Sequence, residues 1–385
     1  MNIVHVAPNS PYEEDWSYQE NLLPKYQSKL GHKVTLVVPN VRHRPPQDGD
    51  CSYENYQSSG GYHVIRQPIT YFPFPFLHRA LRYLKVYQLF CEEKPDLIFH
   101  HGLISPTIHQ AVRYKKKVNP DCVIIQDNHM DYNIGFIPDH LKGRILQLIY
   151  RQLHRSTARY IDKVYGVTPW RQQYAQEVFG VHPDKTDVLI MGADDDQLDF
   201  ENRDRYREQI RRNYGIGDDD FLIVTGGKVD AKKKIHLLMD AVKGLSGVKL
   251  LICGNATDDF ADEYALHLND NVIDAGWIPS EQLYGFFFAS DLAFFPGQHS
   301  VLWEQACASK VPCVFGKWES MDHVNNGGNA CFLDCQTPEQ LRDLIVKLHF
   351  TPEYQTMLQA ARSKKTDIYL YSRIAEKSLE CAVKK

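Results

Sequence analysis

The chain has 385 residues, of which 43% are hydrophobic and 24% charged, and its formal net charge is −4. This length exceeds one ordinary hydrophobic core, so we expect two folded domains of a globular protein. No stretch approaches the roughly 20 uninterrupted apolar residues of a membrane-spanning helix, and the start "MNIVHVAP" lacks the basic flank of a signal peptide. The nine cysteines form no CxxC pair, which indicates reduced thiols and a cytoplasmic protein.

The charge is unevenly distributed along the chain. Residues 1–185 carry 22 Lys and Arg against 17 Asp and Glu, and the other 200 residues carry 22 against 31. A basic first half beside an acidic second half suggests a different partner for each. The excess is too mild to indicate nucleic acid, which we exclude as a partner.

Apolar runs alternate with helical stretches along the first half. The runs are continuous rather than interrupted at every second residue, which is typical of strands buried on both faces of a parallel sheet. We expect strands at residues 3–7, 34–38, 97–99, 123–125 and 164–167. The intervening sequence predicts helices at residues 18–30, 77–92, 107–117 and 140–160, which would form right-handed crossovers.

A polar interval, residues 191–220, separates the two halves and is rich in Asp and Arg. We interpret it as the interdomain connection followed by a surface helix, and its two "DDD" runs as solvated turns rather than a metal site. Strands are then predicted at 221–225, 248–253, 272–274, 292–295 and 311–315, with helices near 235–242, 280–289 and 301–309, and only helices in 337–385. Two open α/β domains bind ligands at the carboxyl ends of their strands, so two such domains facing each other would hold a ligand in the cleft between them.

The stretch "TGGKVDAKKKIHLLMDAV" begins at Thr225 and is the first candidate for chemistry. A strand ends in two glycines, Lys228 follows at once, and three more lysines precede an amphipathic helix. Glycines allow close approach of a ligand to the backbone, and lysines beside a helix start suit a phosphate or diphosphate. A solvated basic loop is an equally good interpretation. The spacing is not that of a Walker A loop, and no GxGxxG follows the first strand.

Glu304 is a lone acid at the front of a predicted helix in "PGQHSVLWEQACASKVP". A carboxylate there stabilises the helix dipole by about 0.5 kcal/mol, which is the simplest explanation. The alternative is that its two oxygens accept hydrogen bonds from the two hydroxyl groups of a ribose.

These motifs make the second half similar to the donor domain of a family 4 glycosyltransferase of GT-B fold, the retaining class that uses nucleotide sugars. "GGKVDAKKKI" resembles the family's "GR…KG" loop, which places Lys228 and Lys233 on the donor diphosphate with Gly227 beside them. "LLICGNA" resembles its Gly-x-Gly strand end at Gly254. "VIDAGWIPSEQLYGFFFASDLAFFPG" resembles the turn that flanks the nucleobase, here Trp277 and Ile278. "LWEQACASKVPCVF" places Glu304 on the second glutamate of the E-x7-E motif, the ribose ligand.

The first half resembles the family more weakly. "SKLGHKVTLVVP", "PDLIFHHG" and "VLIMGADDD" match a strand segment, a strand end and the interdomain hinge, and "VIIQDNHMD" ends where the family places its active-site histidine, here His129. The resemblance implies an acceptor domain at 1–190, a nucleotide-sugar domain at 191–365 and a last helix, 366–385, that packs back on the first domain.

Three positions depart from the family pattern. Lys228 replaces the usual arginine, which keeps the charge but loses the two-pronged geometry. Pro296 stands where the first glutamate of E-x7-E is usual, so Gln298, His299 and the backbone amides of residues 299–301, including Ser300 and Val301, are the available substitutes. "SPYEEDWSYQENL" replaces the family's Gly-Gly loop.

The resemblance implies a retaining glycosyltransferase that moves a sugar from a UDP- or GDP-sugar to a glycan or lipid-linked acceptor, without a metal or other cofactor. His129, Lys228 and Lys233 would be its catalytic residues, and surface polysaccharide or glycoconjugate synthesis its setting. An epimerase and a non-catalytic scaffold of the same fold are the alternatives. The aromatic and basic stretch 71–90 predicts core packing, or else peripheral contact of the N-terminal domain with the inner face of a membrane.

Overall fold

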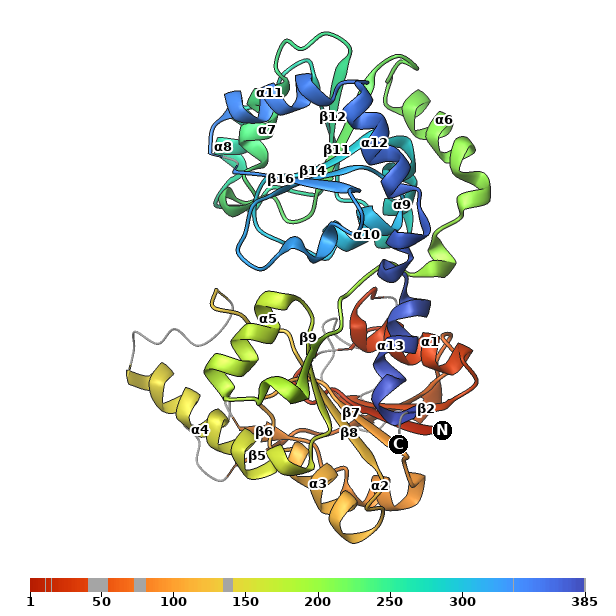
Figure 1. Cartoon of the computed structure of the whole chain (residues 1–385), viewed down its shortest axis with the longest axis vertical. Coiled ribbons are helices and arrows are strands. Elements are labelled where there is room, and N and C mark those ends of the chain that lie inside the picture. The colour runs from red at the N-terminus through yellow and green to blue at the C-terminus, as the bar shows by residue number, and fades with distance from the viewer. Residues whose placement is uncertain are drawn as a thin grey trace. The chain divides into compact units, whose positions relative to one another are not determined.

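The computed structural model describes residues 1–10, 12–14, 16–40, 55–72, 81–133, 141–334 and 336–383 (Figure 1). The chain divides into two units. Unit 1 comprises Met1–Met191 and Tyr371–Lys385, and unit 2 comprises Gly192–Leu370. The polypeptide therefore leaves unit 1, forms the whole of unit 2, and returns to unit 1 for its last helix.

Unit 1 is built on an eight-stranded sheet with the order β10-β9-β8-β7-β1-β2-β4-β3. All neighbouring pairs are parallel except β3 with β4. The strands are β1 (Asn2–Val6), β2 (Lys33–Pro39), β3 (Asn55–Gln57), β4 (His63–Gln67), β7 (Leu97–His100), β8 (Val123–Asn128), β9 (Lys163–Gly166) and β10 (Thr186–Val188). The strand order reverses between β1 and β7, which is where sheets of this kind bind ligands.

The α-helices among the described residues of unit 1 are α1 (Gln19–Lys29), α2 (Tyr87–Glu93), α3 (Ile108–Lys117), α4 (Leu141–Thr157), α5 (Pro169–Tyr174) and α13 (Tyr371–Val383). The last of these packs against the first. The Nε2 of Gln27 in α1 donates to the Oγ of Ser378 in α13 at 2.9 Å. The rings of Tyr26 and Tyr371 stack with centroids 6.3 Å apart.

The predicted helix at residues 77–92 is wrong over part of its length. Residues 82–83 form β6 (Arg82–Tyr83), which pairs antiparallel with β5 (Thr70–Tyr71), and helix α2 begins only at Tyr87. Side chains at the start of α3 hold the segment before α2 in a non-helical form. Thr107, which precedes the helix, accepts from the backbone N–H of Leu84, and Gln110 accepts from that of Val86. Leu84 is buried, as the core interpretation predicts. Residues 73–80 of this stretch lie outside the described residues.

Unit 2 contains a wholly parallel six-stranded sheet with the order β13-β12-β11-β14-β15-β16. Its strands are β11 (Phe221–Gly226), β12 (Val248–Cys253), β13 (Val272–Gly276), β14 (Leu292–Phe295), β15 (Cys313–Gly316) and β16 (Ala330–Leu333). Its α-helices are α6 (Arg203–Asn213), α7 (Ile235–Val242), α8 (Ala261–Leu266), α9 (Ser280–Ala289), α10 (Leu302–Ala308), α11 (Pro338–Leu348) and α12 (Pro352–Ala361). The sequence predicts α7 and α9 to the residue and misses α8 and β16, both of which are short.

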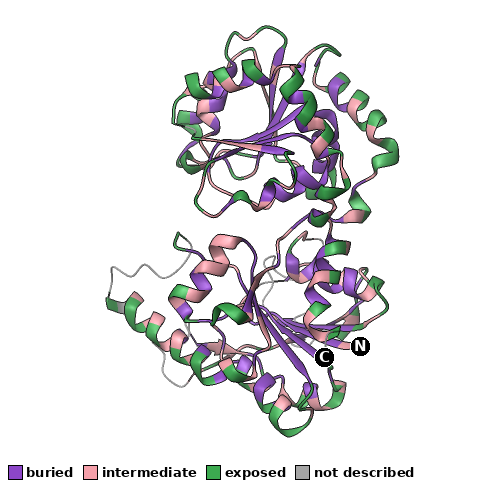
Figure 2. Cartoon of the chain, in the orientation of Figure 1, coloured by how far each residue is buried: buried purple, intermediate pink, exposed green. Residues whose placement is uncertain are grey.

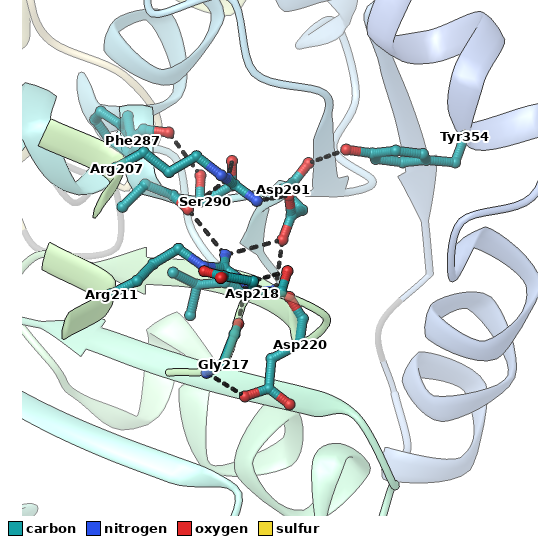
Figure 3. Close-up of polar contacts among 11 residues, drawn as sticks. Arg207, Arg211, Gly217, Asp218, Asp220, Phe287, Ser290, Asp291 and Tyr354 are labelled. Carbon is teal, nitrogen blue, oxygen red and sulfur yellow. Dashed lines mark hydrogen bonds and ion pairs between the residues drawn. The ribbon is translucent and has the colours of Figure 1, made fainter. Parts of the chain in front are cut away.

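The polar surface helix predicted after the interdomain connection is α6, and ion pairs with the buried Asp291 attach it to the sheet (Figure 3). Arg207 and Arg211 bind the two carboxylate oxygens of Asp291 at 2.8 and 3.3 Å. Asp291 also accepts from the backbone N–H of Leu222 in β11, and its own carbonyl accepts from the Tyr354 hydroxyl of α12. Asp291 therefore holds two helices on the sheet, α6 through its carboxylate and α12 through its backbone carbonyl.

The central strands of both sheets are buried, as continuous apolar runs predict (Figure 2). No helix among the described residues is long and apolar enough to cross a membrane. The seven cysteines of the described residues are free.

Candidate active site

The residues predicted to bind a donor lie at one edge of the unit 2 sheet. Four neighbouring strands, β13, β12, β11 and β14, run parallel, so their carboxyl ends meet at the same edge. The residues that follow these strands are Trp277 after β13, Gly254 after β12, Gly227 and Lys228 after β11, and residues 298–301 after β14. Segments up to 74 residues apart in the sequence, from Gly227 to Val301, therefore contribute to one candidate site.

Glycine at Gly254 and Gly297 allows these strand ends to approach one another closely. A Cβ atom at Gly254 would lie 1.9 Å from the carbonyl oxygen of Gly227, and one at Gly297 would lie 2.3 Å from that of Lys232. Any side chain at either position would force the backbones apart. The loop after β11 is thus pressed against the ends of both adjoining strands, and the role that the structure gives to Gly254 is steric.

Lys233 joins two loops of this edge. Its Nζ donates to the backbone carbonyls of Gln298 at 2.7 Å and His299 at 3.1 Å. An ammonium group has three N–H bonds, so one further donor is available in the same place. Lys228, by contrast, is exposed to solvent. The two lysines of the predicted diphosphate site therefore differ, because one is anchored and the other is not.

The anchoring of Lys233 predicts a pH dependence. Burial lowers the pKa of Lys233 to about 8, although Asp230 acts in the opposite direction. The cation is thus complete well below pH 8 and disappears as pH rises through that value, and a bound diphosphate would raise the pKa again. We expect the affinity for UDP to fall above pH 8 and binding near that pH to take up a proton. Isothermal titration calorimetry in buffers of different ionisation enthalpy measures both, and proton uptake absent in wild type would contradict the assignment.

Glu304 lies in α10, is fully buried and is held by two histidines. The Nε2 of His299 lies 2.9 and 3.1 Å from its two oxygens, and the Nε2 of His323 lies 2.8 Å from Oε1. Burial acts to raise the pKa of Glu304, but His299 and His323 lower it to about 2. The carboxylate is therefore ionised, and both imidazoles present an N–H to it.

His323 was not predicted. It lies 19 residues beyond Glu304, in the short 3-10 helix η8 (Asp322–Val324). Its backbone carbonyl accepts from the buried Tyr369 hydroxyl at 2.8 Å. Nothing in the local sequence singles this histidine out, because its partner is brought to it only by the fold.

The two residues predicted to contact the nucleobase are more exposed to solvent than Glu304. The Trp277 side chain is 68% exposed and Ile278 is partly buried. An exposed indole at a sheet edge gives a flat apolar surface on which an aromatic ring can stack. Gln298 is anchored through its backbone, since its N–H donates to Lys232 and its carbonyl accepts from Lys233.

A second polar cluster lies in unit 1, where His129 follows β8 and His101 follows β7. The carboxylate of Asp127 lies between them: His101 Nδ1 is 2.7 Å and His129 Nε2 is 3.3 Å from its Oδ2. Burial acts to lower the pKa of His129 and the Asp127 carboxylate to raise it, with an upward net direction. The strand ends "FHHG" and "QDNH" contain these residues, of which only His129 was predicted to belong to the site.

Each cluster brings three potential metal ligands within 4.8 Å of one another: His299, Glu304 and His323 in unit 2, and His101, Asp127 and His129 in unit 1. In each, an imidazole already lies within hydrogen-bond distance of the carboxylate. We assign no metal to either set, and the expectation that none takes part stays a prediction.

Solved structures of the same fold are numerous. A glycosyltransferase from Rickettsia africae ESF-5 superposes with a TM-score of 0.68 and 15% identity, covering 99% of this chain and 97% of that one. Sucrose-phosphate synthase from Thermosynechococcus elongatus gives 0.67 and 14%, covering 100% and 99%. Anabaena Alr3699/HepE, in complex with UDP, gives 0.67 and 15% over the whole of both chains. The fold is that of a GT-B glycosyltransferase, with two Rossmann-like domains.

Two family models match the chain in succession. Residues 22–197 match "Glycosyltransferase Family 4" and residues 206–365 match "Glycosyl transferases group 1". The chain belongs to the family 4-type glycosyltransferases, which confirms the resemblance and the fold class inferred from the sequence. Among curated protein sequences, none matches it.

Proposed function

We propose that this enzyme transfers a sugar, with retention of configuration, from a nucleoside-diphosphate sugar to a glycan or lipid-linked acceptor. The observation that carries the proposal is the convergence of Lys233 and Glu304 on one loop, residues 296–301. Lys233 is hydrogen-bonded to two backbone carbonyls of this loop, and Glu304 contacts the imidazole of its His299. A cation and a carboxylate on one loop match the diphosphate and the ribose of a nucleotide.

Each predicted residue has a role in the proposal. Lys228 and Lys233 stabilise the diphosphate as it gains charge on leaving, which is the main source of rate enhancement. Glu304 accepts from the ribose hydroxyls, with His299 displaced from Oε2, and Trp277 and Ile278 flank the base. Backbone amides of residues 299–301 supplement the lysines. His129 positions the transferred sugar, and the leaving phosphate takes the acceptor proton, so no protein nucleophile and no metal are required.

The relatives support a uridine nucleotide. HepE of Anabaena has been solved with UDP and with UDP-glucose, the latter at a TM-score of 0.64 and 16% identity. We therefore propose a UDP-sugar, with a GDP-sugar as the other choice. WaaG, a glycosyltransferase involved in lipopolysaccharide biosynthesis, is also similar in fold, with a TM-score of 0.60. It supports surface glycoconjugate synthesis as the setting, and we propose the cytoplasm as the location.

Glu304→Gln tests the ribose assignment. The amide offers one acceptor instead of two and directs its NH2 group at imidazole N–H groups. A lost hydrogen bond to a charged group costs about 1.5–3 kcal/mol, so we expect UDP affinity to fall by about ten- to a hundredfold. Titration calorimetry measures the change, and the exposed Glu319→Gln is the matched control. Equal affinity of the two variants would remove Glu304 from the site.

Retention is tested by incubating the enzyme with UDP-glucose and other nucleotide sugars and candidate glycan or lipid-linked acceptors, followed by NMR of the product anomer. The proposal expects an α-linked product from an α-linked donor. Interconversion of the nucleotide sugar without an acceptor would instead identify an epimerase. No nucleotide-sugar turnover and no binding would identify a scaffold.

We further propose that unit 1 contacts a membrane surface through α4. One face of this helix exposes Leu141, Ile145 and Leu148, whose side chains are 76%, 48% and 66% exposed, and the exposed Arg144 and Arg155 lie on the same face. The helix contains no acidic residue, which suits an anionic lipid surface.

The helix α4 proposal predicts a loss of membrane binding when the apolar face is charged. The double variant Leu141→Glu and Leu148→Glu should bind vesicles of phosphatidylglycerol and phosphatidylcholine at least about tenfold more weakly in a pelleting assay, since two leucines lose their apolar contact. Leu266→Glu, at an equally exposed leucine of unit 2, is the control. Equal pelleting of both variants, or none by wild type, would overturn the proposal.

A further inference from the structure

A continuous chain of buried hydrogen bonds runs through unit 1 and ends at Asp127. The Oε1 of Gln27 lies 2.7 Å from His5 Nε2, and His5 Nδ1 lies 3.1 Å from His101 Nε2. His101 Nδ1 in turn lies 2.7 Å from Asp127 Oδ2. His5, Gln27 and Asp127 are fully buried and His101 is 3% exposed, so each of these groups depends on its protein partners.

The C-terminal helix fixes the orientation of the Gln27 amide. The Oγ of Ser378 donates its only hydrogen to the carbonyl of Ala375 at 2.6 Å. Ser378 must therefore accept from Gln27, which requires the Nε2 of Gln27 on that side at 2.9 Å. The Oε1 of Gln27, which can only accept, then faces His5.

The hydrogen bonds made by the His5 and His101 rings require one more N–H than two neutral imidazoles contain. Gln27 requires an N–H on His5 Nε2, the ionised Asp127 requires an N–H on His101 Nδ1, and the contact between the rings requires a third. Two neutral imidazoles have only two N–H bonds. We infer that the His5–His101 pair carries one positive charge, that this charge resides on His101, and that it neutralises Asp127.

The surroundings of the pair place the charge on His101 rather than His5. Burial and the neighbouring His101 lower the pKa of His5 to about 3. The ring of Phe99 packs against both imidazoles, with centroids 5.1 Å from His5 and 4.8 Å from His101, so it does not distinguish them. His101 alone contacts a carboxylate. The other titratable neighbour, His100, is buried, and burial lowers its pKa to about 4, so it stays neutral.

The ion pair between His101 and Asp127 also determines how the Asp127 carboxylate acts on His129. The Oδ1 of Asp127 accepts from the backbone N–H of Gly102 at 2.7 Å, so both oxygens are held. His129 faces Asp127, Glu20 and Arg171. With its charge balanced by His101, Asp127 orients the ring of His129 from 3.3 Å and raises the pKa of His129 less than an unpaired carboxylate would. His5, His101 and Gln27 are then positioning residues for His129; this consequence rests on the proposed function, whereas the charge of the pair does not.

Nitrogen-15 NMR of the full, ligand-free chain labelled at histidine tests the inference, and its result does not depend on transfer activity. We expect His101 to show the imidazolium pattern at pH 7, with both ring nitrogens protonated, and His5 to show the neutral tautomer protonated at Nε2. In His101→Gln, Asp127 loses its compensating charge, so the pKa of His129 should rise by about 1 or more. A neutral His101 at pH 7, or a His129 pKa unchanged in the variant, would overturn the inference.

A second measurement covers the case in which His101→Gln does not fold. Neutron diffraction from wild-type crystals locates the exchangeable hydrogens directly. Three of them on the two rings would support the inference, and two would overturn it.

Discussion

Replacing Lys233 by alanine is expected to lower kcat/KM for the donor by about a hundred- to a thousandfold. This range corresponds to losing one preorganised donor to a developing negative charge, about 2.7–4 kcal/mol. We expect a large effect because two backbone carbonyls already hold the Lys233 ammonium. Its side chain therefore loses little conformational entropy when a diphosphate binds. The initial rate of UDP release with saturating acceptor measures the effect.

Two neighbouring substitutions control for charge and for folding. Lys232→Ala removes the same charge from the adjacent exposed residue and should retain activity within about threefold, since surface charges contribute little. Lys233→Arg keeps the charge and should recover part of the rate. Wild-type activity in Lys233→Ala, or equal losses in Lys232→Ala and Lys233→Ala, would contradict the assignment of Lys233.

Asp291→Ala is expected to destabilise unit 2 by about 3–5 kcal/mol, the usual cost of breaking a buried ion pair from one side. The substitution leaves Arg211, which is 3% exposed, without its only carboxylate partner among the described residues. It also removes the acceptor of the Leu222 N–H in β11. Figure 3 shows both arginines directed at this one side chain.

Chemical denaturation followed by circular dichroism measures this loss. Asp270→Ala, at an exposed aspartate of the same unit, is the control and should change the free energy of unfolding by less than about 0.5 kcal/mol. If Asp291→Ala unfolded at the same denaturant concentration as this control, Asp291 would not be the attachment point of α6.

The sequence predicts the architecture well because the central strands are long apolar runs, such as residues 248–253, whose form depends little on context. It fails at residues 82–86, where local periodicity favours a helix. There, Thr107 and Gln110 at the start of another helix supply partners for the backbone and outweigh the local preference. Elements as short as β16 contain too few residues to show a recognisable hydrophobic pattern.

The candidate site was predictable only where it is carried by linear motifs. Lys233 and Glu304 stand in recognisable segments, whereas His323 and His101 acquire meaning from residues 19 and 26 positions away. The missing first carboxylate of the E-x7-E motif illustrates the same limit. Pro296 directly follows β14, and the next loop places His299 within hydrogen-bond distance of Glu304. The sequence shows that the first glutamate is missing, but it does not show this contact.

Equilibrium binding of nucleotides tests the central claim most directly. UDP, UDP-glucose, GDP and GDP-mannose are titrated into wild type and Lys233→Ala at pH 7 by isothermal calorimetry. The account predicts that wild type binds one nucleoside diphosphate and its sugar conjugate, and that Lys233→Ala binds them at least about tenfold more weakly, since a charge-assisted hydrogen bond is worth about 1.5–3 kcal/mol. Absence of binding by wild type to all four compounds, or equal affinity in the variant, would contradict it.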